Sequence, residues 1–120
     1  FLDAKVIRND NRYGTTIIET GIGRLSIPEC QFEVGQRFRV RILSDDVSIT
    51  LSKSKDSSIS NIFKVKVKKI ATDSKHMKII TLESGSTQIK ARITKKSSEI
   101  LNLELNDEVF AQIKTVAITY

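Results

Sequence analysis

Cysteine, proline and tryptophan are almost missing from this chain of 120 residues, which contains one Cys, one Pro and no Trp. A single cysteine, Cys30, excludes an intrachain disulfide framework and a paired-thiol zinc site, and it suits a reducing compartment. His76 is the only histidine, so no second imidazole accompanies it as a metal ligand. We therefore expect Cys30 to be structural or incidental, His76 to be a loop residue, and no metal ion to be bound directly.

Long apolar runs and an export signal are also missing. No stretch of about 18 apolar residues occurs, which is the length that a membrane-spanning helix needs. The chain opens with the residues FLDAK, without an initiator methionine and without the apolar core of a signal peptide. We expect a piece of a longer chain that does not itself cross a membrane.

Charge of one sign is in excess, and it is unevenly spread. Twenty Lys and Arg residues stand against 14 Asp and Glu, which gives a net charge of +6. Up to Ser52 the chain has seven basic and seven acidic residues, and after it thirteen basic and seven acidic. A basic surplus favours anionic partners. The length is that of one ordinary domain or two very small ones, which excludes an enzyme with separate cofactor and substrate domains.

β-branched residues are what the chain does contain, with 17 Ile, 8 Val and 10 Thr, and they favour strands. Residues 37–42 and 63–68 alternate with period two, so that apolar side chains face a core and Arg or Lys side chains face water. Short strands separated by polar turns are typical of a small barrel. Further strands are expected at residues 5–7, 15–19, 24–27, 47–51, 78–82, 87–93 and 108–114.

One short helical turn is predicted at residues 94–101. Thr94 or Ser97 would cap its N-terminus, and Ile100 and Leu101 would face the core. Residues 52–60 are polar apart from one isoleucine, which makes this stretch the natural seam between two halves. The predicted organisation is therefore a first half at residues 1–52 and a second half at residues 53–120.

An internal repeat supports two related halves. Residues 34–42 align with residues 105–113 at a constant offset of 71, so that Phe38, Val40 and Ile42 match Val109, Ala111 and Ile113. Each aligned segment follows a turn. At the front of the halves the offset is 61, and the extra residues of the second half are most simply an insertion at residues 94–103. We expect two β modules, of which only the second carries the helical turn.

Four segments in order resemble a known family. They are DVSITLS at residues 46–52, SSISNI at 57–62, ARITKKS at 91–97 and AQIKTVA at 111–117. Together they are similar to the C-terminal regulatory region of the ATP-binding subunit of molybdate and tungstate ABC transporters, built from molybdopterin-binding-protein-like (Mop, or TOBE) modules. The resemblance implies a mainly β fold of OB-like small β-barrel modules, with a first TOBE-like half and a second, Mop-like, oxyanion-binding half. The nucleotide-binding domain of that family is not in this chain, since no Gly-rich phosphate loop occurs.

The resemblance also implies an oxyanion site. Molybdate and tungstate are tetrahedral dianions whose oxygens only accept hydrogen bonds, so a suitable site supplies donors alone. The residues carried over bear five hydroxyls, one amide and one ammonium group, and no carboxylate, which suits an oxyanion. Apart from the resemblance, Ser and Thr at such positions are usually caps of the backbone. The implied binding residues are Ser58, Ser60, Asn61, Thr94, Ser97, Lys114 and Thr115.

The first loop departs from the family pattern at one position. The family commonly has an arginine where this chain has Ser60, so a guanidinium is replaced by a hydroxyl. A charge-assisted contact is worth about 1.5–3 kcal/mol, and its loss would weaken binding roughly ten- to a hundredfold. Arg92, Lys95 and Lys96 are close in sequence to Thr94 and are the candidates for a compensating cation.

A regulatory role follows from the resemblance. Cytoplasmic molybdate or tungstate would bind between two copies and hold the transporter in a non-transporting arrangement, which gives feedback on import. The implied partners are a second copy in a homodimer or higher homo-oligomer, the nucleotide-binding domain of the same chain and the transporter's membrane subunits. The domain would be cytoplasmic and peripheral to the membrane, with no cofactor and no enzymatic activity of its own. The two oxyanions are nearly identical in size and charge, so the sequence does not choose between them.

The alternative from another functional class is an OB-like module that binds single-stranded nucleic acid. Such modules need exposed rings on which bases stack. Phe38 and Phe63 fall on the predicted core face, and the remaining aromatics, Tyr13, Phe110 and Tyr120, are scattered, so no nucleic-acid partner is expected. An enzyme is disfavoured because no carboxylate pair, Cys/His pair or Ser/His/Asp set occurs at motif spacing. The basic stripe of the second half is then a solvated sheet face that deters edge pairing, formed by Lys64, Lys66, Lys68 and Lys69.

Overall fold

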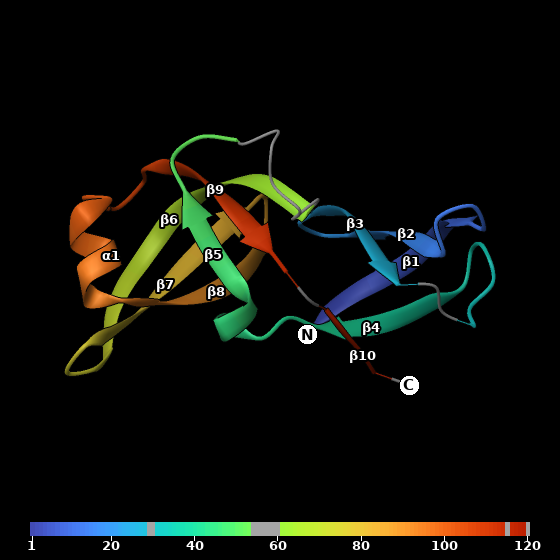
Figure 1. The fold of residues 1–120 in the computed structure, drawn as a ribbon, viewed down its shortest axis with the longest axis horizontal. Helices are drawn as coiled ribbons and strands as arrows, with labels where there is room; N and C mark the ends of the chain where they lie inside the picture. Colours follow the sequence, from blue (N-terminus) through green and yellow to red (C-terminus); the bar gives the residue numbers. More distant parts are fainter. Residues whose placement is uncertain (29–30, 54–60, 115, 120) are drawn as a thin grey trace.

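The computed structural model describes residues 1–28, 31–53, 61–114 and 116–119. It confirms the mainly β prediction: ten strands, one 3-10 turn and one short helix form an elongated molecule of 43 × 29 × 24 Å (Figure 1). The elements are β1 (Leu2–Asp10), β2 (Thr15–Thr20), β3 (Gly23–Pro28), β4 (Arg37–Arg41), η1 (Ser44–Asp46), β5 (Val47–Thr50), β6 (Asn61–Ser74), β7 (Met77–Ser84), β8 (Thr87–Thr94), α1 (Lys95–Ile100), β9 (Glu108–Ile113) and β10 (Ala117–Thr119).

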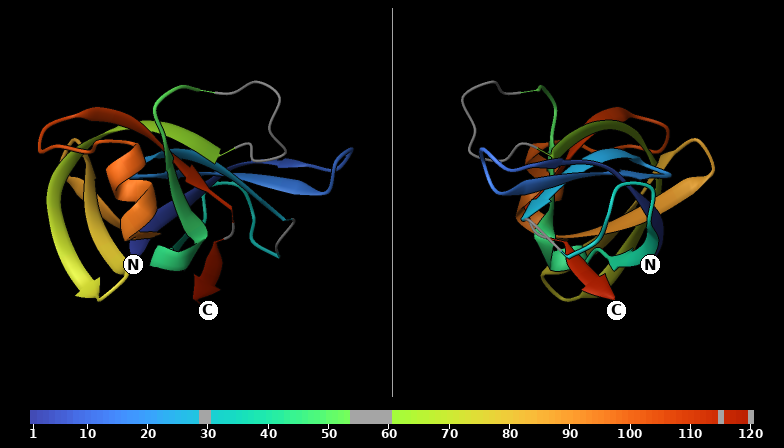
Figure 2. Two further views of the ribbon diagram at one scale, coloured as in Figure 1. Left: turned by 60° about the vertical axis from the view of Figure 1, so that its left-hand side comes forward. Right: turned by 90° about the vertical axis from the view of Figure 1, so that its right-hand side faces the viewer.

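The strands form two five-stranded antiparallel sheets (Figure 2). The order in the first sheet is β10-β4-β1-β2-β3, and the order in the second is β5-β9-β6-β7-β8. The two edge strands of the second sheet, β5 and β8, lie close to each other, so this sheet curls back on itself as a small barrel does. All the strand pairs follow the same antiparallel pattern.

The two sheets exchange a strand. β5 follows β4 along the chain but pairs with β9, with Ile49 opposite Ala111. β10 follows β9 but pairs with β4, with Ile118 opposite Val40. The repeated segments thus form β4 and β9. In each case, the strand that follows along the chain belongs to the other sheet. Strand pairing does not divide at Ser52, because β5 lies in the second sheet and β10 in the first.

A single apolar core runs through both sheets, and period-two alternation places its side chains there. Val40, Val65 and Val67 are buried, while the arginines and lysines between them are exposed. The same cluster contains buried residues of both sheets. Because the core is shared, the two sheets pack together as one structural unit and not as two separate domains.

The helix is shorter than predicted. It covers Lys95–Ile100, with Thr94 as its N-cap, and none of the helices in the described ranges is long and apolar enough to cross a membrane. Leu101 packs against the core as expected, but the prediction for Ile100 is wrong, because its side chain is 71% exposed. The buried residue of the helix is Ser98. Ile100 lies two positions further, about 200° around the helix axis, and therefore on the opposite face.

The turn between β2 and β3 packs against the second sheet. Ile22 at its tip is buried, and the glycines on either side touch second-sheet residues. A Cβ on Gly23 would lie 2.7 Å from the Phe63 ring, and one on Gly21 would overlap the Thr87 hydroxyl. The turn therefore needs glycine for space, and Gly23, with φ of 137°, needs it for backbone conformation as well.

The variant Gly23→Ala is expected to lower the free energy of unfolding by about 1–3 kcal/mol, since a methyl group would be forced into the Phe63 ring. Urea unfolding followed by circular dichroism measures this change. Gly85→Ala is the matched control, because Gly85 also has positive φ but open space around it. Equal losses for both variants would show that backbone conformation, and not contact with Phe63, decides the cost.

Candidate functional site

Two of the implied binding residues, Asn61 and Lys114, lie at the same end of the second sheet. Asn61 begins β6 and pairs with Ile113, the last residue of β9, so Lys114 comes directly after that pair. The Lys114 side chain is exposed, and its backbone N–H donates to the Asp46 carbonyl at 3.0 Å. This bond adjoins the Val47–Ile113 pair of β5 and β9 and joins the chain before β5 to the chain after β9.

The Asn61 side chain is already engaged within the chain. It is buried, its Oδ1 accepts the Ser26 N–H at 2.8 Å, and its Nδ2 donates to the Ser26 carbonyl at 2.9 Å. The side-chain amide thus forms one accepting and one donating hydrogen bond with the Ser26 backbone, as a neighbouring strand would. These bonds join the start of β6 to β3 of the first sheet. At most the second N–H of Nδ2 is left for a ligand, so in this structure Asn61 mainly positions the strand.

Thr94 and Ser97 form the cap of α1. Thr94 Oγ1 accepts the Ser97 N–H at 3.0 Å and donates to Ser97 Oγ at 2.9 Å. Both residues are exposed. The Thr94 hydrogen is therefore used inside the cap, whereas the Ser97 hydroxyl keeps its own hydrogen for another acceptor.

A cavity of about 390 Å³ opens beside this cap. Lys95 and Lys96 line it with two ammonium groups, while Glu99 adds a carboxylate, so its charges partly cancel. The other lining residues are Thr94, His76 and Met77. His76 lies in the turn between β6 and β7, as predicted, and in the described ranges no cluster of His, Cys, Asp and Glu could hold a metal ion.

Within the described residues, no hydrogen bond joins the cap to Asn61 or Lys114. Thr94 pairs with Met77, which in turn pairs with Ser74 at the end of β6. The curled sheet brings this end back toward η1, because Arg92 contacts both Asp73 and Asp45, and the neighbouring Asp46 carbonyl accepts the Lys114 N–H. Ser58, Ser60, Thr115 and Cys30 lie outside the described residues, so the structure places four of the seven implied binding residues, in two separate groups.

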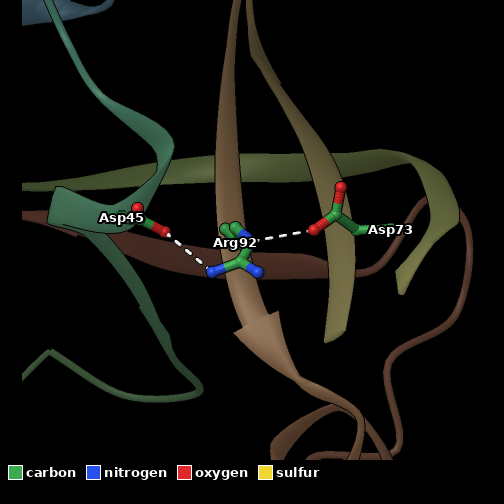
Figure 3. A network of polar contacts seen from close by, with 3 residues as sticks. All are labelled: Asp45, Asp73 and Arg92. Carbon is green, nitrogen blue, oxygen red and sulfur yellow. Dashed lines mark hydrogen bonds and ion pairs between the residues drawn. The ribbon is translucent and has the colours of Figure 1, made fainter. Parts of the chain in front are cut away.

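Arg92 is not a spare cation for the anion site. Its Nε donates to Asp73 Oδ2 at 2.8 Å, and its Nη1 lies 3.5 Å from Asp45 Oδ1 (Figure 3). The hydrogen bond to Asp73 is the main reason that the pKa of the Arg92 guanidinium is raised above its ordinary value. The side chain links β8 to β6 and to η1 before β5, and so helps to close the second sheet where its edges approach.

The basic stripe of β6 has the exposure of a solvated face. Lys64 lies 3.1 Å from Glu108 as an exposed ion pair, and Lys68 lies 3.8 Å from the half-buried Glu83. Such pairs near the surface contribute little to stability. Phe110, which is half-buried, pairs with Lys64, whereas Tyr13, 68% exposed, lies in the β1–β2 turn of the other sheet.

Comparison with known proteins settles the family. The profile of the TOBE domain matches residues 57–119, which is more than half of the chain. The chain belongs to the TOBE-domain family. This TOBE chain is 36% identical over 96% of its length to the molybdenum import ATP-binding protein ModC of Hahella chejuensis. It is 37% identical over 98% of its length to the ModC protein of Saccharophagus degradans. It spans about a third of the length of these relatives.

A solved structure has the same fold. The cytoplasmic molybdate-binding protein ModG, crystallised with molybdate bound, superposes with a TM-score of 0.77. The match covers 98% of the TOBE chain and 94% of the ModG chain, at 20% sequence identity. At this identity the likeness shows the fold and not the ligand.

No residue pattern indicates the hydrogen-bond partner of Asn61. Ser26 contributes only its backbone N–H and carbonyl, and backbone atoms leave no trace in residue type. The resemblance placed Asn61 in the oxyanion shell of the TOBE domain, whereas the structure shows that most of its hydrogen-bonding capacity joins the two sheets.

The variant Asn61→Ala is expected to lower the free energy of unfolding of the TOBE domain by about 1–3 kcal/mol, because the Ser26 backbone groups would lose their partners in a half-buried place. Thermal and urea unfolding measure this loss. Ser48→Ala is the control, since it removes an exposed hydroxyl bonded to Gln112 and should change stability by less than about 0.5 kcal/mol. A stability of Asn61→Ala equal to that of the control would mean that the bridge contributes nothing.

Proposed function

We propose that this TOBE domain binds molybdate or tungstate and thereby regulates a molybdenum-importing ABC transporter. The observation that carries the proposal is the near-complete coverage of the chain by ModC proteins, at 36–37% identity in the two cited. The fold of molybdate-binding ModG supports it over both halves. The described binding candidates offer hydroxyl, amide and ammonium donors, which is the chemistry that a tetrahedral dianion requires.

The donors form two groups with no hydrogen bond between them in the described residues, which argues for a site shared between copies. Lys114 follows β9, whereas Thr94 ends β8 and Ser97 lies in α1. A dianion is costly to bury unless donors surround it, and either group alone surrounds it on one side. A two-fold arrangement can bring the cap of one copy to Lys114 of the other, and it creates two equal sites at once. The proposed assembly is therefore a homodimer or a higher homo-oligomer.

Regulation follows from where the ligand binds. A ligand whose shell is completed by two copies stabilises only the arrangement that brings these copies together, by at most its preference for that arrangement. In the proposed transporter, this arrangement keeps the ATPase subunits from completing transport when cytoplasmic oxyanion is abundant. The chain's own task is to bind the ligand. ATP hydrolysis belongs to the nucleotide-binding domain of the longer ATPase subunit, and the membrane subunits move the ion.

Molybdate and tungstate are expected to raise the melting temperature of the domain more than sulfate does, because binding to the folded state stabilises it by mass action. Differential scanning fluorimetry at constant ionic strength measures the three shifts. Sulfate is the control for general screening of the positive charge. Equal shifts for all three anions would reduce the proposed site to a generic basic surface.

The variant Lys114→Ala is expected to weaken molybdate binding by about 2–3 kcal/mol, the scale of a charged donor to a ligand. Isothermal titration calorimetry measures the change, and analytical ultracentrifugation with molybdate measures the assembly. Lys66→Ala is the matched control, because Lys66 is exposed on β6 near Glu108, at the opposite end of β9. Unchanged affinity in Lys114→Ala would remove Lys114 from the ligand shell.

A further inference from the structure

A cavity of about 360 Å³ lies where the first sheet meets β8. Arg41 and Ser44, from the end of β4 and the start of η1, line it on one side, and Gln88 and Lys90 of β8 line it on the other. We call it the connector cavity, because the chain between β4 and β5 forms one wall. It contains none of the seven residues implied by the family resemblance.

The polar groups of the connector cavity are donors. Arg41 supplies a guanidinium, Lys90 an ammonium group, Gln88 an amide and Ser44 a hydroxyl, and no carboxylate lines the cavity. Gln88 Nε2 gives one hydrogen to Glu83 at 2.9 Å and keeps the other. Within the described ranges, neither Arg41 nor Lys90 forms an ion pair with a carboxylate. Two cations from different sheets thus line a common space that has no carboxylate on its walls, and Arg41 Cζ lies 6.0 Å from the centre of the Phe1 ring, which also lines the cavity.

The internal repeat relates this cavity to the region around Lys114. At the offset of 71, Leu43 and Ser44 occupy the positions of Lys114 and Thr115. Leu43 carries no charge, which by sequence alone argues against a second site. In the folded chain the charge comes from other positions, from Arg41 two residues earlier and from Lys90 across the cavity. The cavity is therefore the first-half counterpart of the Lys114 region, with different residues supplying the cations.

We propose that the connector cavity is a second oxyanion site, complete within one chain, for a small tetrahedral dianion. Apolar walls from Leu43 and Ile89 exclude part of the water and strengthen the attraction of the ion to both cations compared with an open surface. The volume exceeds that of one such ion, which therefore keeps part of its hydration shell. Binding should be weaker and less selective than at a fully enclosed site. Because Arg41 and Lys90 belong to different sheets, the bound ion also stabilises their packing.

The test separates this site from the one under Proposed function. Molybdate and sulfate are titrated by calorimetry into the wild-type domain, the Lys114→Ala variant and the double variant R41Q/K90Q. The control R24Q/K69Q removes the same charge from exposed positions on β3 and β6 that form no ion pair within the described residues, so it reports the general electrostatic effect. In Lys114→Ala, NMR follows the Gln88 side-chain amide and the Ser44 backbone N–H.

The expected result is a weaker binding event that persists in Lys114→Ala, shifts the Gln88 and Ser44 signals, and loses at least tenfold in affinity in R41Q/K90Q but not in R24Q/K69Q. Equal affinities in R41Q/K90Q and R24Q/K69Q would overturn the second site. Wild-type affinity in Lys114→Ala would count against the Lys114 site alone, because the connector cavity is judged by its own pair of variants.

Discussion

The pairing of β4 and β5 with β10 and β9 is the constraint on which the structure depends. Because β5 and β10 each complete the opposite sheet, these two pairs of consecutive strands are held together in both sheets. The Lys114 N–H donates to the Asp46 carbonyl between them, and the Asn61 amide joins the sheets at a second place by holding β6 to Ser26 of β3. Buried backbone groups need hydrogen-bond partners. The Ser26 and Asp46 backbone groups find theirs in Asn61 and Lys114 of the second half. The shared core follows from this exchange.

Both anion sites proposed for this domain use residues beside these paired strands. Lys114 follows β9, and the chain between β4 and β5 forms one wall of the connector cavity. The cap at Thr94 lies at the end of β8. The two proposals differ in kind, because one site needs a second copy to surround the ligand and the other does not. A domain with both would respond to oxyanion in two concentration ranges, first at the shared site and then at the weaker connector cavity.

Sequence patterns predicted much of this fold because alternation and capping are local. The alternation of Val65 and Val67 with lysines, and the cap at Thr94, depend on neighbours in the chain. The strand exchange was not predictable in the same way, since a repeat shows that β4 and β9 are alike but not which strand pairs with which. The binding residues remain a prediction carried over from the family resemblance as a set of residue types, whereas the engagement of Asn61 by backbone atoms and of Arg92 by Asp45 and Asp73 required coordinates.

The exchanged strands determine what happens when the chain is divided into its two halves. A gene cut in the polar seam would yield one polypeptide with β5 but no β9 to receive it, and another with β10 but no β4. Each piece would expose an unpaired strand edge that the other piece covers. Exposed edges of this kind promote aggregation. The two pieces would complete each other's sheets only by associating in trans, so the second half is expected to need the first for its own sheet to be complete.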